Sequence, residues 1–150
     1  MIIATTYNLY RDGQKVREGL TTTNVTESGL IPNKSYSYQV SALNEAGESI
    51  LSAALVVKTP YSAPTGVTLS SSTLALTTGG NRTLTATIAP STAQQQVNWK
   101  TGDAATATVD TNGKVIAVKA GTVTITAESK TDTSKKATCT VTITDPAGGG

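Results

Sequence analysis

Apolar and polar residues alternate along most of this chain with a period of two, which is the pattern of half-buried β-strands. Residues 7–11 form a typical run, and Asp12-Gly13 directly after it is a hairpin-turn signal. Similar short runs follow one another, with Gly, Asn, Asp or Pro between them. No window places apolar residues at the i, i+3, i+4 and i+7 positions of a helix. The pattern therefore predicts an all-β protein.

The stretch 60–66 interrupts this alternation with two prolines and several small polar residues. Such a composition is typical of a short, semi-rigid linker between domains. Because the strands on either side are short and evenly spaced, we predict two tandem β-sandwiches. The predicted boundaries are 1–60 for the first domain, 61–65 for the linker, 66–146 for the second domain and 147–150 for a flexible tail.

Each predicted strand is a β-rich run bounded by turn-forming residues. In the first domain the predicted strands are 5–11, 14–18, 22–26, 35–44 and 53–59. In the second domain they are 66–70, 73–76, 81–88, 97–101, 107–109, 115–118, 122–128 and 137–144.

The most informative part of the first domain is residues 30–49, with the spacing L-x-P-x-x-x-Y-x-Y-x-V-x-A-x-N-x-x-G-x-S. Tyr36 at the start of this strand can bury its ring while its hydroxyl returns to the backbone, the tyrosine-corner device of sandwich domains. On these residues the segment 5–60 resembles a fibronectin type III domain. The resemblance implies strands C, C′, E, F and G only, since strands A and B have no counterpart. The first sandwich is thus expected to be incomplete.

The second domain has Val97-Asn98-Trp99 in one strand and two tight turns, at Asn112-Gly113 and Ala120-Gly121. Glycine supplies the positive φ that such turns need. In order and spacing, residues 65–145 closely resemble the bacterial Ig-like domain of group 2. The resemblance places Trp99 on strand C, so we expect its ring to be part of the core.

Composition and charge argue against several classes of function. The chain has no His, which excludes Ser–His and Cys–His dyads and His metal clusters. Its ten acidic residues lack the close alternation of a calcium-binding loop, and its net charge of +2 gives no nucleic-acid footprint. No run approaches the roughly 18 apolar residues of a membrane span. We expect no enzyme activity, no cofactor or metal, no nucleic-acid partner and no membrane insertion.

Both resembled families imply display or spacer modules, which occur on bacterial surface adhesins, secreted enzymes and bacteriophage virion proteins. The start MIIATTY shows no secretory signal, and the single Cys139 cannot form an intrachain disulfide. We therefore expect a bacteriophage structural protein of the virion, assembled in the host cytoplasm, with capsid decoration as the leading expectation. The alternatives are a fragment of a bacterial surface adhesin and an accessory carbohydrate-binding module of a secreted enzyme.

Without strands A and B, the first domain is expected to expose an apolar face and a strand edge, which other chains can cover. The expected partners are other virion proteins or further copies of this chain, with weak contact to cell-surface glycans as an additional expectation. The residues predicted at this assembly interface are Ile2, Ile3, Tyr7 and Leu9, with the apolar residues of 22–26 and 51–57 nearby.

Overall fold

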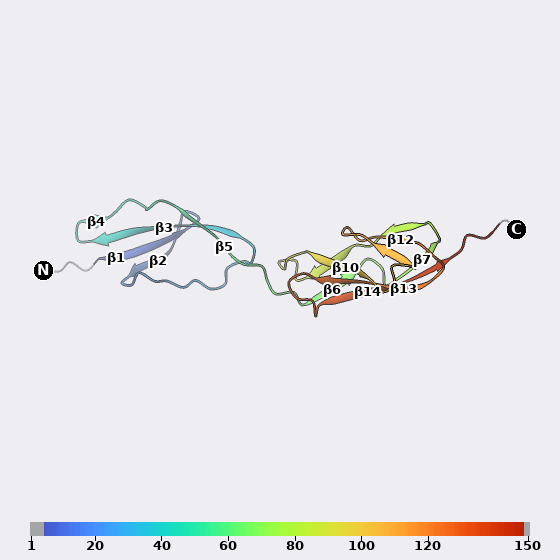
Figure 1. The fold of residues 1–150 in the computed structure, drawn as a ribbon. Coiled ribbons are helices and arrows are strands. Elements are labelled where there is room, and N and C mark those ends of the chain that lie inside the picture. The colour runs from blue at the N-terminus through green and yellow to red at the C-terminus, as the bar shows by residue number, and fades with distance from the viewer. Residues whose placement is uncertain (1–4, 149–150) are drawn as a thin grey trace. The chain divides into compact units, whose positions relative to one another are not determined.

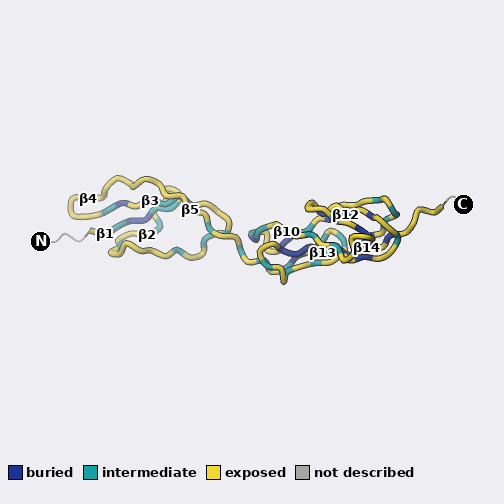
Figure 2. Tube along the Cα trace, viewed as in Figure 1, coloured by how far each residue is buried: buried dark blue, intermediate teal, exposed yellow. Residues whose placement is uncertain are grey.

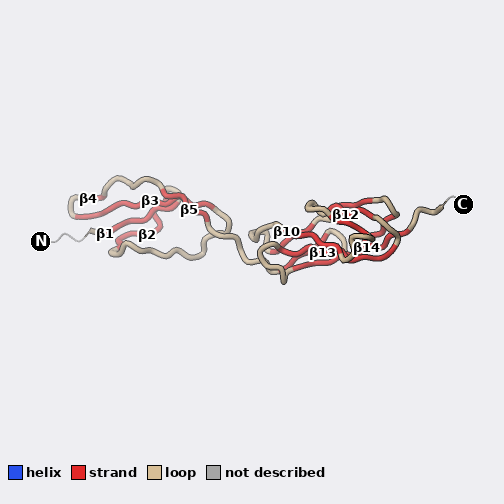
Figure 3. Tube along the Cα trace, in the orientation of Figure 1, coloured by secondary structure: helices blue, strands red, loops and turns tan. Residues whose placement is uncertain are grey.

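The computed structural model describes residues 5–148, and within that range it contains β-strands and no helix (Figures 1 and 3). The predicted all-β class is therefore confirmed. The chain divides into two compact units, Met1–Tyr61 and Ser62–Gly150, which we call unit 1 and unit 2.

Unit 1 is built on one antiparallel sheet. Its strands are β1 (Thr6–Arg11), β2 (Gln14–Leu20), β3 (Ser35–Asn44), β4 (Gly47–Glu48) and β5 (Leu55–Lys58). The sheet order is β2-β1-β3, and both β4 and β5 pair with β3 on its other side. The β1–β2 hairpin turns at Asp12 and Gly13, whose φ values of 51° and 80° fit the positive-φ turn that the sequence predicts.

The predicted strand at residues 22–26 does not form in unit 1. These residues pair with no other strand; instead the hydroxyl of Thr22 donates a hydrogen bond to the Asn24 carbonyl, 2.9 Å away. They belong to a long loop, residues 21–34, between β2 and β3. A β-prone composition gives a strand only where a neighbouring strand accepts its backbone groups, and no such neighbour exists among the described residues of unit 1.

Unit 2 has nine strands in three groups of hydrogen-bonded neighbours. The first group is the four-stranded sheet β10-β13-β14-β7, with β10 (Val97–Thr101), β13 (Gly121–Ser129), β14 (Lys136–Thr144) and β7 (Thr73–Thr77). The second is the three-stranded sheet β11-β12-β8, with β11 (Ala107–Val109), β12 (Lys114–Ala117) and β8 (Asn81–Thr83). The third is the pair β6 (Gly66–Leu69) and β9 (Ala86–Ala89).

The single strand predicted at 81–88 is wrong, because the structure divides it into β8 and β9. β8 pairs with β12, whereas β9 pairs with β6. Between them the N–H of Leu84 donates to the Gly113 carbonyl, and Thr85 exchanges hydrogen bonds with Ser70. The chain therefore changes sheets at Leu84 and Thr85, a step that an unbroken alternation of residues does not reveal.

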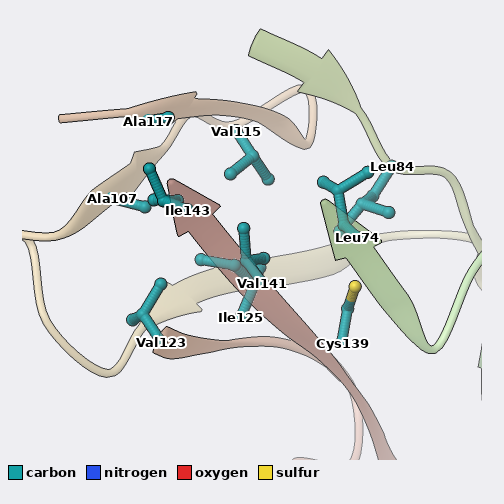
Figure 4. Packing of buried hydrophobic residues seen from close by; sticks show 10 residues of the cluster. All are labelled: Leu74, Leu84, Ala107, Val115, Ala117, Val123, Ile125, Cys139, Val141 and Ile143. Atoms are coloured by element: carbon teal, nitrogen blue, oxygen red, sulfur yellow. The ribbon is translucent and has the colours of Figure 1, made fainter. Parts of the chain in front are cut away.

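The strands of unit 2 enclose a main cluster of buried apolar residues and a smaller second one. In β14 the apolar residues Cys139, Val141 and Ile143 are buried while the threonines between them are exposed, as period-two alternation predicts. Figure 4 shows the side chains of the main cluster gathered between the facing strands. Its members are Leu74, Leu84, Ala107, Val115, Ala117, Val123, Ile125, Cys139, Val141 and Ile143.

Candidate functional site

The described residues show no cluster of metal-ligating side chains. Residues 5–148 contain no group of three or more Cys, Asp or Glu side chains that could hold a metal ion. In the same range, no helix has the length and apolar character needed to cross a membrane. The features that distinguish this chain are instead the two faces of the unit 1 sheet.

The strand register decides which side chains share a face. Leu9 pairs with Val40 and Tyr38 with Leu55, and directly paired residues point to the same side of a sheet. We call this side the apolar face. Its members on β1, β3 and β5 are Tyr7, Leu9, Arg11, Tyr36, Tyr38, Val40, Ala42, Leu55 and Val57.

The opposite face of the sheet is polar and centres on Glu48. One Glu48 carboxylate oxygen accepts hydrogen bonds from Asn8 (2.7 Å), Tyr10 (2.8 Å) and Ser41. Lys15 lies 3.8 Å from the other oxygen. These donors, Ser41 first, lower the pKa of Glu48 to about 2. Glu48 is thus a satisfied structural carboxylate at the centre of this face.

Part of the apolar face is covered by the loop 21–34. Glu27 of this loop accepts a hydrogen bond from Arg11 at 3.1 Å and another from the Tyr38 hydroxyl at 2.7 Å. Burial and the nearby Glu27 carboxylate raise the pKa of the Tyr38 phenol, so it stays protonated and keeps donating. Because Arg11 and Tyr38 are sheet residues, the three side chains fix the loop to the sheet.

The loop does not fill the space it covers. A cavity of about 240 Å³ lies between it and the sheet. The cavity is lined by Tyr7, Leu9, Leu20, Thr22, Thr23, Asn24, Val25 and Val40. A second hollow, of about 260 Å³, is lined by Leu9, Val25, Glu27, Leu30 and Tyr38. The loop is therefore a loose cover compared with the packed second sheet of a sandwich.

Three residues of the apolar face stay exposed, including Val40, which also lines the larger cavity. Val40 is 43% exposed, Leu55 65% and Val57 43%, although all three lie on the side of the sheet that carries buried Leu9. We call these three residues the open patch. Figure 2 shows the contrast along unit 1: buried segments occur in β1 and β3, whereas β5 is exposed.

The structure places the predicted site residues in different settings. Tyr7 is half-buried and Leu9 is only 6% exposed, and both line the larger cavity. Ile2 and Ile3, the other predicted interface residues, lie outside the described residues. Tyr36 is buried, and its hydroxyl accepts a hydrogen bond from the Ile31 N–H at 2.9 Å. The geometry is that of a tyrosine corner.

Trp99 in unit 2 is partly buried and packs against two clusters of core residues. The site residues that the sequence did not single out are Glu27 and Val40, whereas Leu55 and Val57 belong to the range 51–57 expected near the interface. Glu27 contacts partners 11 and 16 residues away in the chain, a distance that no local pattern reveals. The alternation of side chains along β3 predicts that Val40 lies on the same face as Tyr36 and Tyr38. Only the strand register shows that Leu9 and Leu55 also lie on this face.

Unit 2, with facing antiparallel and mixed sheets around its buried apolar clusters, has the architecture of an Ig-like β-sandwich. The family model of the bacterial Ig-like domain (group 2) matches residues 63–141, which is more than half of the chain. The chain therefore belongs to the bacterial Ig-like domain (group 2) family, and the prediction for the second domain is confirmed. The fibronectin type III resemblance of residues 5–60 stays a prediction.

Similar proteins include an Ig-like virion protein of Serratia phage KSP90, which is 41% identical over 106 residues and covers 69% of this chain and 41% of that protein. That share of the chain exceeds unit 2, so the alignment also includes part of unit 1. The minor capsid protein of Enterobacteria phage T3 is 47% identical over 64 residues, covering 43% of this chain and 14% of that protein.

Lacto-N-biosidase of Bifidobacterium bifidum is 41% identical over 95 residues, covering 60% of this chain and 8% of that enzyme. The chain spans less than half the length of each of these three relatives. Among solved structures, this chain is similar to the S-layer protein rSbsC, with a TM-score of 0.52 and 18% sequence identity. The match covers 100% of this chain and 21% of the rSbsC chain. At that identity the likeness shows the fold alone.

Proposed function

We propose that this chain is a non-enzymatic structural protein of a bacteriophage virion, attached through unit 1 and presenting its Ig-like unit 2 outward. The observation that carries the proposal is the difference in closure between the units. Unit 2 encloses its apolar residues, whereas unit 1 leaves the open patch bare on a sheet that has no second layer among the described residues. Exposed apolar residues gathered on one sheet face support an interaction surface there.

The two phage relatives, described as a virion protein and a minor capsid protein, support the virion as the place where the chain acts. The partners in this proposal are other virion proteins, and capsid decoration is the specific role that fits a small, outward-facing domain. The proposal also takes the chain to be assembled into particles in the host cytoplasm.

The side chains of unit 1 support a non-enzymatic role. A general acid or base works best with a pKa near the operating pH. The pKa of Glu48 is far below neutrality, and its carboxylate already accepts three hydrogen bonds. Glu27 is likewise engaged by Arg11 and Tyr38, so neither carboxylate is set up to carry a proton for a substrate.

An accessory role in carbohydrate binding is the second candidate, since the match with Lacto-N-biosidase shows a similar segment within a glycosidase. Sugar rings commonly stack on exposed aromatic side chains. Within residues 5–148, Tyr61, at 47% exposure, is the one aromatic residue that is largely exposed. A single ring offers a small platform, so this candidate ranks below the virion role.

Immunogold labelling of purified phage particles tests the proposal. Antibodies raised against the full chain should label particles of the phage that encodes it, at regular positions on capsid or tail. Particles grown from a phage with the gene deleted serve as the control and should carry no label. Label confined to the host surface or the culture medium would contradict the virion role and favour a secreted or surface-bound protein.

A further inference from the structure

We infer that unit 2 has a binding site for one neutral sugar ring, in a hollow beside Trp99. The inference goes beyond the virion role, because binding a sugar does not depend on attachment through unit 1 or on where the chain acts. It gives the second candidate, carbohydrate binding, a place in the fold and a class of ligand. Absence of sugar binding would leave the immunogold result for the virion role unaffected, so the two can fail separately.

The hollow has a volume of about 190 Å³ and lies at β10, the last strand of the four-stranded sheet. Val97 and Trp99 line it from β10, and Val109 lines it from the end of β11. Pockets for drug-sized ligands measure about 300–1,000 Å³. A hollow of the observed size therefore suits a single ring, with the rest of a longer ligand left in solvent.

The Trp99 ring is held in place by its surroundings. It packs against both clusters of buried apolar residues in unit 2. A Cβ on Gly113 would lie 2.6 Å from its Cζ2 and 2.9 Å from its Cε2, so the backbone of the turn at Gly113 lies directly against the ring. A side chain that is already fixed loses little conformational freedom when a ligand binds beside it.

The indole N–H of Trp99 is a polar group that a ligand in the hollow can use. It donates no hydrogen bond to any described residue, and no side-chain nitrogen or oxygen in this part of the chain is buried without a partner. The N–H is therefore accessible from the surface. The ring atom Cε2, which is bonded to this nitrogen, lies beside the turn whose Asp110 and Thr111 line the hollow. The ring thus offers apolar surface and a hydrogen-bond donor together.

Polar side chains form the rim of the hollow, namely Asn98, Asp110, Thr111 and Lys130. Oδ1 of Asp110 accepts hydrogen bonds from the N–H groups of Asn112 at 2.8 Å and Lys114 at 2.9 Å, so the turn holds this carboxylate in position. The ion pairs found among the described residues involve neither Asp110 nor Lys130. Both charged groups therefore remain available to a ligand.

The charges at the rim favour a neutral ligand. Asp110 and Lys130 contribute one charge of each sign, so an anion attracted by Lys130 is repelled by Asp110, and a cation meets the opposite problem. Sugar hydroxyls both donate and accept hydrogen bonds, so one ring can pair with a carboxylate oxygen, an ammonium group and an amide. An apolar side chain in the same place would leave these groups without partners.

The competing interpretation is that water alone fills the hollow and that Trp99 serves only the core. Substitution of Trp99 cannot separate the two interpretations, because the ring packs on buried residues in both. Lys130 and Asn98 are exposed, so replacing either side chain tests binding with little effect on folding.

The test follows the indole N–H signal of the full chain by proton–nitrogen correlation NMR. Trp99 is the single Trp, so the spectrum contains one such signal, and it reports on the hollow. Glucose, galactose and N-acetylglucosamine are titrated separately, with glycerol as a control that has hydroxyl groups but no ring. We expect a saturable shift of the signal with at least one sugar and none with glycerol. Absence of a saturable shift with every sugar, or an equal shift with glycerol, would overturn the inference.

Two lysine substitutions then test the position of the site. Lys130→Met should raise the dissociation constant of the bound sugar at least about fivefold, because a hydrogen bond from a charged donor is lost. Lys136→Met is the matched control, since Lys136 is an exposed lysine of unit 2 outside the hollow, and it should leave the constant unchanged. An unchanged constant in Lys130→Met, or equal weakening by both variants, would contradict the site.

A second variant and a charged sugar complete the experiment. Asn98→Ala removes another rim group and should also weaken binding, which keeps the site testable if Lys130→Met fails to fold. Glucuronate, which carries a carboxylate on a glucose-like ring, should bind no more tightly than glucose. Tighter binding of glucuronate would contradict a site for a neutral ring.

Discussion

The two units of this chain are both all-β, yet they handle apolar side chains in opposite ways. In unit 2, Ile125, Val141 and Cys139 are fully buried between facing sheets. In unit 1, the buried apolar residues among those described are Leu9 and Tyr36. Of twelve large hydrophobic residues that are exposed in the described range, ten belong to unit 1. The difference lies in the number of layers and not in the strands themselves.

The comparison teaches that a sheet alone does not make a core. The β3 strand alternates as regularly as β14, but its apolar side faces a loop on one part and nothing on the other. A second sheet would turn the same residues into a core, as it does in unit 2. We therefore regard unit 2 as the self-sufficient module and unit 1 as the interacting one.

The largest effect is expected from a core truncation in unit 2. Ile125→Ala should lower the free energy of unfolding of unit 2 by about 2–5 kcal/mol, because it removes fully buried methyl groups and leaves a cavity. Ile116→Ala, at a position 42% exposed, is the control and should change it by less than about 0.5 kcal/mol. Trp99 is the single Trp of the chain and lies in unit 2, so Trp fluorescence during urea unfolding reports on this unit alone.

A smaller loss of stability is expected from a substitution in the turn between β11 and β12. Gly113 has a φ of 82°, and a Cβ there would lie 2.3 Å from the Leu84 carbonyl oxygen and 2.6 Å from the Trp99 ring. Gly113→Ala should therefore destabilise unit 2 by about 1–3 kcal/mol. Gly66→Ala is the matched control, because Gly66 has open space around it and no positive φ. Equal effects of the two substitutions in the Trp signal would show that the turn geometry is not limiting.

In unit 1 a single substitution removes the hydrogen bond of the tyrosine corner. Tyr36→Phe should destabilise unit 1 by about 1 kcal/mol, because the Ile31 N–H loses its acceptor. All five tyrosines lie in unit 1, so near-ultraviolet tyrosine signals report on this unit. Tyr61→Phe is the control, since Tyr61 is 47% exposed. A shift in the Trp signal of unit 2 instead would contradict the assignment of Tyr36 to unit 1.

The most modest effect is a difference in acid sensitivity. The pKa of Glu48 is lowered from 4.5 to about 2, so its carboxylate is favoured in the folded state. The stabilisation is complete above pH 4.5 and is lost as the pH falls toward 2. Glu48→Gln should flatten the pH dependence of unit 1 unfolding in this window. The tyrosine signal of the wild type and the variant, followed between pH 5 and 2, measures the difference.

Unit 2 provides a control for the effect of Glu48→Gln on the pH dependence of unfolding. Hydrogen bonds from Thr106 and from the Ala105 backbone lower the pKa of Asp103, so unit 2 also has an acid-sensitive carboxylate. Glu48→Gln should leave the acid response of the Trp signal unchanged. An equal change in both units would mean that Glu48 acts on the whole chain and not through its contacts with Asn8, Tyr10 and Ser41.

Much of this fold follows from the sequence because each strand of unit 2 packs one side on a core, and period-two alternation records that packing. The prediction failed where pairing, and not alternation, decides the structure. Residues 22–26 have β-prone composition but no neighbour, and the chain changes sheets at Leu84 without breaking its alternation. The range 51–57 was expected near the interface, but only the pairing of β3 with β1 and β5 shows that Leu55 and Val57 share a face with Val40.

Amide hydrogen exchange of the full chain tests the central claim most directly. The claim is that unit 2 is closed by itself, whereas unit 1 leaves part of its apolar face open. We predict that peptides from β13 and β14 are strongly protected, whereas peptides from β5 exchange much faster. Protection of β5 as strong as that of β13 would contradict the account.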